Sequence, residues 1–272
     1  MRRRTALAAL LAAGAVPASA GLAYGAAGGP ARAGADAGTG SGTEAGGGPR
    51  PPASLLGEEI RRLPTSRKEV ALTFNAAWDE AGIAEVLEIL RRRGLPATFF
   101  PTGAFADAHP AAVRAMGAAH GLGNHSYSHP FFDDLDTQER AEEVRRADAA
   151  IRRASGTEPL PFFRFPYSST TEESVADVND LGYAAIEFTA DTNGYLGPQG
   201  GMTAAAAAGR AIDALGPGAI IQMHVGSNGD GVVLDAEALP LVIDAAEEEG
   251  YRIVDLREFL VPARAATPSG AA

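Results

Sequence analysis

The sequence predicts an α/β protein with parallel strands, and three observations favour this fold class. Between about residues 67 and 260, short apolar runs alternate with amphipathic stretches, which is typical of strands linked by helices. A chain of 272 residues with 46% apolar residues can bury a sizeable core as one globular domain. It contains no cysteine, so that core would hold without disulfides. Parallel strands joined by helices close into a barrel or form an open doubly wound sheet.

The first half of this region contains three expected strands and three expected helices. Ile83, Val86 and Leu90 recur at helical spacing before Gly94, which favours a helix ending there. Gly156 ends a long charged segment in the same way. The expected strands cover residues 70–74, 97–100 and 122–124, and the expected helices cover residues 83–94, 110–119 and 137–154.

The second half repeats the pattern. Apolar runs rich in Phe, Ile and Val indicate strands, and an alanine-rich segment and two amphipathic segments indicate helices. The expected strands cover residues 162–164, 183–188, 219–223 and 252–254, and the expected helices cover residues 172–181, 203–215 and 236–249. Some seven strands therefore alternate with helices.

The two ends of the chain have a different composition. Residues 1–20 resemble a signal peptide, with basic residues first, an apolar run from Ala6 to Val16 and a small-x-small cleavage site at Ala18-Ser19-Ala20. A retained anchor is the alternative, but the apolar run is shorter than the roughly 20 residues of a membrane-spanning helix. Residues 21–60 predict a flexible Gly/Ala/Pro-rich linker, and residues 261–272 a disordered tail. The domain itself is expected over residues 67–260.

Composition also excludes several functions. The absence of cysteine excludes thiol catalysis, zinc knuckles and iron–sulfur clusters. The formal net charge is −11, and loss of three arginines with the signal would leave 20 basic against 34 acidic residues, or −14. Such a charge works against binding to a phosphate backbone. We therefore expect no nucleic-acid partner and, after signal removal, no membrane span.

Polar side chains follow several of the expected strands. The carboxyl ends of parallel strands meet at one rim, where functional groups collect. The residues at these strand ends are Asn75 with Asp79, His125 with His129, Arg164 with Tyr167, Asp191, and His224. The sequence therefore predicts a functional site at this rim.

Two histidines four residues apart are the clearest local signal. On a turn or helical loop, His125 and His129 would lie on one side and could bind one divalent metal ion at about 2.0–2.1 Å. Zinc is favoured because imidazole with a carboxylate or water suits it, and nickel, cobalt or copper remain alternatives. The competing interpretation is that both histidines only hydrogen-bond a loop.

The ordered motifs of the chain resemble the polysaccharide deacetylases, carbohydrate esterase family four with its NodB-like homology domain. The resemblance covers about residues 67–260. It implies a distorted (β/α) barrel and a metal-dependent hydrolase that removes acetyl groups from chitin, peptidoglycan and related polymers. The segments that carry it are Thr73-Phe74-Asn75-Ala76-Ala77-Trp78-Asp79, Ala97-Thr98-Phe99-Phe100-Pro101-Thr102-Gly103, His125-Ser126-Tyr127-Ser128-His129-Pro130, Arg164-Phe165-Pro166-Tyr167, Asp191-Thr192-Asn193-Gly194-Tyr195 and Gln222-Met223-His224.

The resemblance implies roles for these residues. His125 and His129 would hold the metal ion. His224 would be the general acid that protonates the departing nitrogen, although a buried structural histidine is the alternative. Arg164 and Asp191 would orient the catalytic groups through charge-assisted hydrogen bonds.

Two segments depart from the family pattern. The family has two adjacent aspartates, a base and a metal ligand, where this chain has Asn75 and Ala76. An amide does not accept a proton as a carboxylate does, and a methyl group does not bind metal, so the usual mechanism does not transfer unchanged. The family's second acid and tryptophan of the fourth segment are Gly194 and Tyr195 here.

Nearby residues suggest replacements. Asp79 could supply a carboxylate as metal ligand or base, although capping the helix that begins near Glu80 is an equally simple role. Asn75 could remain a weak ligand through its carbonyl oxygen. Trp78, the only tryptophan, is expected to bind substrate together with Tyr167 and Tyr195, with plain packing of Trp78 as the alternative.

Three functions follow from these observations. The first is an exported or envelope-associated, metal-dependent deacetylase of an N-acetylated glycan. The second is a noncatalytic glycan-binding descendant, favoured by Asn75 and Ala76. The third is a hydrolase of a different ester or amide that uses Asp79.

Overall fold

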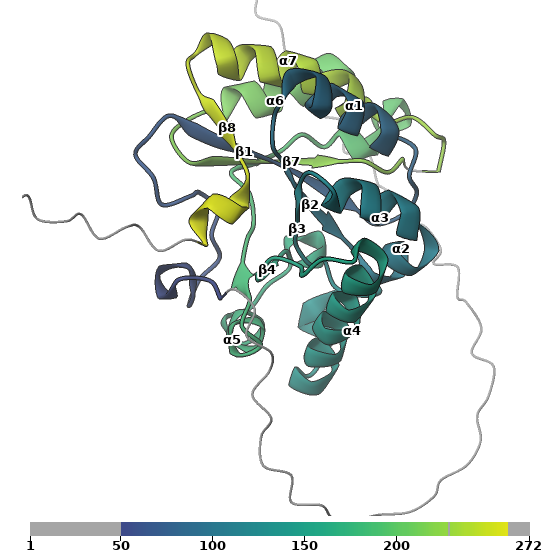
Figure 1. The fold of residues 1–272 in the computed structure, drawn as a ribbon, viewed down its shortest axis with the longest axis vertical. Coiled ribbons are helices and arrows are strands. Elements are labelled where there is room, and N and C mark those ends of the chain that lie inside the picture. Colours follow the sequence, from purple (N-terminus) through teal and green to yellow (C-terminus); the bar gives the residue numbers. More distant parts are fainter. Residues whose placement is uncertain (1–49, 228, 261–272) are drawn as a thin grey trace, which may run out of the picture. The chain divides into compact units, whose positions relative to one another are not determined.

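The structure is a computed structural model that describes residues 50–227 and 229–260. The expected signal peptide, most of the expected linker and the expected tail lie outside the described residues. Within the described part, parallel strands carry helices on their outer side (Figure 1). No helix of this part is long and apolar enough to cross a membrane.

The main sheet contains six parallel strands around a central β1. Their order is β3-β2-β1-β7-β6, and β8 pairs with the amino-terminal half of β1 on the side where β2 pairs with its carboxyl-terminal half. The strands are β1 (Glu69–Ala76), β2 (Thr98–Pro101), β3 (Gly121–Leu122), β6 (Ala190–Asp191), β7 (Ala219–His224) and β8 (Arg252–Val254).

The helices connect these strands and follow the predicted order. Capping residues set several boundaries: Asp136 begins α4 with a capping box, and Gly94 and Gly156 end α1 and α4 in left-handed conformations. The α-helices are α1 (Ile83–Arg93), α2 (Gly103–Ala108), α3 (Pro110–Gly117), α4 (Thr137–Ser155), α5 (Glu172–Asp180), α6 (Ala204–Asp213) and α7 (Leu234–Glu248). Short 3-10 turns lie at Ala53–Leu55, Phe132–Asp134, Pro166–Ser168, Gly194–Leu196, Pro198–Gly200 and Leu256–Phe259.

A second pair of strands completes the circuit of a distorted barrel. These strands, β4 (Phe162–Phe163) and β5 (Ala184–Ala185), are parallel and only two residues long. A bridge from Asn124 to Phe163 joins the end of β3 to β4. On the other side, Ile60 bridges Ile186, and Arg62 pairs with Ala219 of β7. The segment around residues 60–62 therefore closes the ring between β5 and β7.

This closure corrects the predicted linker boundary. Leu55, Ile60 and Leu63 are buried against the barrel interior, so residues 53–63 belong to the folded unit rather than to a flexible linker. The prediction was wrong here because four charged residues interrupt the apolar ones, so the segment shows no helix or strand period, although Leu55, Ile60 and Leu63 pack.

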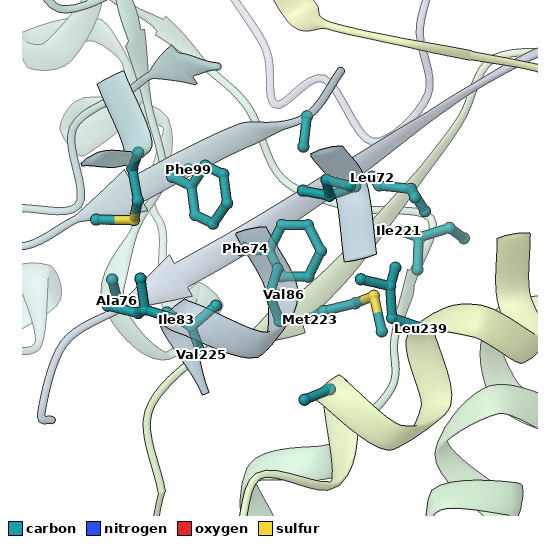
Figure 2. Packing of buried hydrophobic residues seen from close by; sticks show 14 of the residues in the cluster. Leu72, Phe74, Ala76, Ile83, Val86, Phe99, Ile221, Met223, Val225 and Leu239 are labelled. Atoms are coloured by element: carbon teal, nitrogen blue, oxygen red, sulfur yellow. The ribbon is translucent and has the colours of Figure 1, made fainter. Parts of the chain in front are cut away.

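Alternation along β1 and β7 separates two environments. One face of β1 and β7 packs under α1 and α7 and includes Leu72, Phe74, Ala76, Ile221 and Met223 (Figure 2). The opposite face carries Asn75, Gln222 and His224, and Asn75 is the register partner of His224. The polar residues of the two central strands thus lie close together inside the barrel, at the carboxyl-terminal end of the sheet.

Candidate functional site

A cavity of about 240 Å³ lies at the carboxyl-terminal ends of the central strands. Eight of the ten residues that the sequence analysis selected line it. Its wall consists of Asn75, Ala77, Trp78, His125, His129, Phe165, Tyr167, Ser168, Asp191, Tyr195, Gln222, His224 and Gly226. Arg164 lies fully buried behind this wall, and Asp79 lies outside it.

The two predicted metal-binding histidines face each other. The Nε2 atoms of His125 and His129 are 3.2 Å apart. His125 Nδ1 lies 2.8 Å from the Arg164 carbonyl oxygen, which only accepts a hydrogen bond. Nδ1 of His125 must therefore carry the proton, which leaves the lone pair on Nε2 directed at His129. A separation of this size suits two nitrogens that bind one ion at about 2.0–2.1 Å.

Burial keeps both imidazoles neutral. It lowers the pKa of His125 well below its ordinary value, and the neighbouring His129 adds to the effect. Burial also lowers the pKa of His129 to about 4. Since a metal ion binds the deprotonated ring, the pair has the protonation state that coordination requires at neutral pH.

The described part of the chain places no third protein ligand beside this pair. Among the described residues, no group of three His, Cys, Asp or Glu side chains is arranged to hold a metal ion. The structure does not bring Asp79 to the histidines. Its carboxylate accepts hydrogen bonds from the backbone N–H groups of Ala81 and Ser227, both 3.0 Å long, and from the Ser227 hydroxyl at 2.5 Å.

Asp79 thus joins its own loop to the loop of Ser227. It does not cap α1, whose N-cap is Gly82 without a side-chain hydrogen bond, so the capping alternative is wrong as well. Burial tends to raise the pKa of its carboxyl, but the hydrogen bonds from Ser227 and Ala81 outweigh burial and leave the pKa below its ordinary value. A carboxylate held by three donors is not free to serve as a base.

Asn75 belongs to a chain of four polar side chains, three buried and one half-buried, in which Gln222 is the member that was not selected as a site residue from the sequence. Arg164 Nη1 donates to Asn75 Oδ1 at 3.1 Å, and Asn75 Nδ2 donates to Gln222 Oε1 at 3.2 Å. Gln222 Nε2 in turn donates to Asp191 Oδ2 at 2.8 Å. A guanidinium only donates and a carboxylate only accepts, so the two ends fix the orientation of both amides.

This chain leaves Arg164 without a direct carboxylate partner. Burial lowers the pKa of its guanidinium to about 10, although Glu187 and Asp191 oppose the shift. The Asn75 oxygen is committed to this buried cation. It is therefore not available as the weak metal ligand that the sequence analysis considered.

Ala76 points into a different environment. It is fully buried in the apolar cluster with Ile83, Met223 and Val225, on the helix side of β1 (Figure 2). In this conformation, the position where the family has its second aspartate does not face the histidine pair.

His224 lies between two carboxylates. Its Nδ1 is 3.9 Å from Asp191 Oδ1 and 3.6 Å from Asp235 Oδ2, and its backbone N–H donates to the same Asp235 oxygen at 2.7 Å. Asp235 is fully buried in the first turn of α7. A side chain at Gly194 would collide with the Asp235 carboxylate. The Asp235 carboxylate therefore lies beside Gly194, the position where the family has its second acid. The sequence offered no signal for Asp235, because it lies far from Gly194 along the chain.

Aromatic rings and strained turns surround the cavity. Trp78, Tyr167 and Tyr195 are all exposed, and Trp78 and Tyr167 each lie against the His129 ring. Backbone strain in the left-handed region is frequent at functional sites. Five non-glycine residues have positive φ in the described part, and all belong to loops at this cavity: Ser126, His129, Tyr167, Ser168 and Asn193.

Comparison with known proteins agrees with this fold. A model of the polysaccharide deacetylase family matches residues 62–186. A chitooligosaccharide deacetylase from Sinorhizobium fredii is 29% identical over 72% of this chain and 94% of its own length. A peptidoglycan-N-acetylglucosamine deacetylase from Bacillus cereus is 27% identical over 71% of this chain and 68% of its own length.

Solved structures show the same architecture. A family-four carbohydrate esterase pseudoenzyme from Bacillus anthracis has a TM-score of 0.68 and 27% identity over 76% of this chain and 70% of its own length. A mutant of that pseudoenzyme has restored enzymatic activity. The fold and these relatives are therefore those of a carbohydrate-active hydrolase of the distorted-barrel type. The family model, the relatives and the solved structures together support a polysaccharide deacetylase of carbohydrate esterase family four.

Proposed function

We propose that this protein is a metal-dependent deacetylase that acts at the cell envelope on an N-acetylated glycan. The observation that carries the proposal is the convergence of His125, His129 and His224 on one cavity. The relatives named as chitooligosaccharide and peptidoglycan deacetylases support the substrate class. The signal-like residues 1–20 support export.

The metal would be held by His125 and His129. When bound, a zinc or similar ion would polarise the acetyl carbonyl and lower the pKa of a bound water. Because the described residues provide two rather than three protein ligands, we expect weaker metal binding than in a site with three ligands.

His224 would carry out the proton transfers. Amide hydrolysis adds water to the acetyl carbon and breaks the carbon–nitrogen bond, giving acetate and a free amine. Asn75 has no ionisable group, and Asp79 is held by Ser227, so neither suits the role of base. We propose that His224 accepts the proton of the attacking water and donates a proton to the departing nitrogen, with Asp191 and Asp235 orienting its ring.

A noncatalytic glycan-binding protein is the second candidate. It is favoured by the buried, apolar position of Ala76 and by the amide at position 75. The Bacillus anthracis relative described as a pseudoenzyme shows that the fold can persist without activity.

The deciding experiment combines metal analysis with acetate release. Metal content is measured in the purified protein, and acetate release is measured from chitooligosaccharides and peptidoglycan fragments with zinc, nickel, cobalt or no metal. The variants are His125→Ala, His224→Ala and Asp79→Ala. For the deacetylase, we expect loss of bound metal in His125→Ala, loss of acetate release in His224→Ala with metal retained, and near-full activity in Asp79→Ala.

The outcomes separate the two candidates. Glycan binding without acetate release under any metal would leave only the noncatalytic function. A large loss of activity in Asp79→Ala, with unchanged thermal stability, would contradict the role assigned here and restore Asp79 as a catalytic residue.

A further inference from the structure

Two exposed aromatic rings form a stacked pair next to the cavity. Phe131 is 49% exposed and Tyr167 is 53% exposed. Their ring centroids are 4.0 Å apart with an interplanar angle of 17°. Exposed apolar surface of this kind indicates an interaction site when it is continuous with a pocket.

The pair is held by buried neighbours rather than by its own packing. Phe132 and Phe165, next in sequence to Phe131 and near Tyr167, are fully buried against each other. The Ser169 hydroxyl donates to Asp133 at 2.5 Å, which ties the two loops that carry the rings. The loops are therefore anchored from within while both rings face outward.

The backbone beneath Tyr167 is strained. Tyr167 and Ser168 both have positive φ, of 59° and 51°. Such conformations cost on the order of 1–3 kcal/mol each and persist where the surroundings enforce them. A buried carboxylate contributes here, since the Phe165 N–H donates to Glu187 Oε1 at 3.2 Å. In this conformation the Tyr167 ring is half exposed and packs against Phe131 and His129 rather than in the core.

The pair continues the aromatic wall of the cavity outward. Tyr167 lines the cavity and lies edge-on to His129, with centroids 4.6 Å apart. Trp78 lies against the same imidazole, with ring centroids 5.3 Å apart. Rings therefore extend from the histidine pair through Tyr167 to Phe131.

We propose that the Phe131–Tyr167 pair is a subsite for the pyranose ring next to the one whose acetyl group enters the cavity. This inference rests on the proposed function and extends it to a glycan of at least two units. A sugar ring presents an apolar face that suits an aromatic platform. Asp133 and Asp134 beside Phe131, with the overall net charge of −11, favour an uncharged N-acetylated glycan over an acidic polysaccharide.

The test measures affinity against glycan length. The wild type, Phe131→Ala and Phe131→Tyr are titrated calorimetrically with N-acetylated chitooligosaccharides of two to five units and with an acidic polysaccharide fragment. Leu241→Ala, which removes an exposed side chain of α7 that does not line the cavity, is the control. Circular dichroism and thermal unfolding check that each variant folds.

We expect the affinity of the wild type to increase with the length of the oligosaccharide. In Phe131→Ala this increase should disappear, so that the affinity for the longer oligosaccharides falls about 3- to 10-fold relative to the wild type. Affinity for the shortest bound oligosaccharide stays unchanged, Phe131→Tyr retains the gain, and Leu241→Ala behaves as wild type. A gain that survives in Phe131→Ala, or an equal loss at all lengths, overturns the subsite and leaves the proposed function intact. Absence of wild-type binding at every length contradicts both.

Discussion

At the scale of single residues, Asp235 is the least expected member of the site. Its fully buried carboxylate lies 3.6 Å from His224 Nδ1 and accepts the His224 backbone N–H. Removal of its charge with retention of its shape tests whether it orients the imidazole. We expect Asp235→Asn to lower kcat for acetate release about 10- to 100-fold with little change in KM, because the carboxylate does not line the cavity.

Glu237→Gln is the matched control, because it removes an exposed charge from the same first turn of α7. It should leave both constants unchanged. An effect of Asp235→Asn confined to KM, or no effect on kcat, would show that Asp235 only supports the fold.

Positions 76 and 77 should respond differently to a carboxylate. Ala76 is fully buried with Ile83 and Val225, whereas Ala77 is half-buried and lines the cavity. We expect Ala76→Asp to lower the free energy of unfolding by about 3–5 kcal/mol, since it buries an unpaired charge. Ala77→Asp should cost less than about 1 kcal/mol. Chemical denaturation of both variants checks this difference. Equal stabilities would mean that the end of β1 turns toward the cavity and offers the site a third ligand.

At the scale of elements, the 123–130 loop makes stability depend on pH in metal-free protein. His129 has a pKa of about 4 in the folded state, below the ordinary value of 6.5. The unfolded chain therefore takes up a proton first as the pH falls. The contribution of His129 is complete above pH 6.5 and is lost between pH 6.5 and 4, up to about 3 kcal/mol.

Chemical denaturation with a chelator, at several values between pH 7 and pH 4, measures this loss. The variant His129→Gln should lose less stability over the same range, because it lacks the group that titrates. If the wild type and the variant lose stability in parallel, His129 is solvated in the folded state and the metal-binding interpretation loses its electrostatic support.

The elements also show what a sequence can predict. Long helices with caps, such as α4, and apolar strands, such as β7, were predicted within one or two residues. The six-residue helix α2 was missed, because a segment of six residues is too short to show a helical period. The strand expected over residues 183–188 is shorter in the structure, where it consists of the two-residue β5 and an isolated bridge at Ile186. The apolar run predicted a strand, but it does not show how far the pairing with neighbouring strands extends.

The site, like the elements, was predictable only in part. Residues at strand ends were predicted to meet, because parallel topology alone places them on one rim, and six of these eight residues line the cavity. Side-chain orientation was not predictable. Neither the hydrogen bond between Asn75 and Arg164 nor the one between Asp79 and Ser227 depends on spacing along the chain; both depend on which neighbour the fold supplies. The catalytic and metal-binding roles themselves remain predictions.

At the scale of the whole molecule, closure of the barrel depends on a segment that composition assigns to a linker. Ile60 bridges Ile186, and its buried side chain packs with Leu55 and Leu63 inside the ring. We expect Ile60→Ala to lower the free energy of unfolding by about 2–4 kcal/mol. Leu56→Ala, at an exposed neighbouring position, should cost less than about 0.5 kcal/mol.

Truncation gives the stronger form of the same prediction. A chain that begins at residue 67 lacks the buried aliphatic side chains of Leu55, Ile60 and Leu63, each contributing roughly 1.5–3 kcal/mol, out of a total stability of about 5–15 kcal/mol for a typical domain. It should unfold at a much lower temperature than a chain that begins at residue 50, and lose glycan binding with the opened barrel. If the two chains unfold at the same temperature and bind glycan equally, the strands β5 and β7 hold the ring without residues 60–62, and the segment only covers a barrel that is already closed.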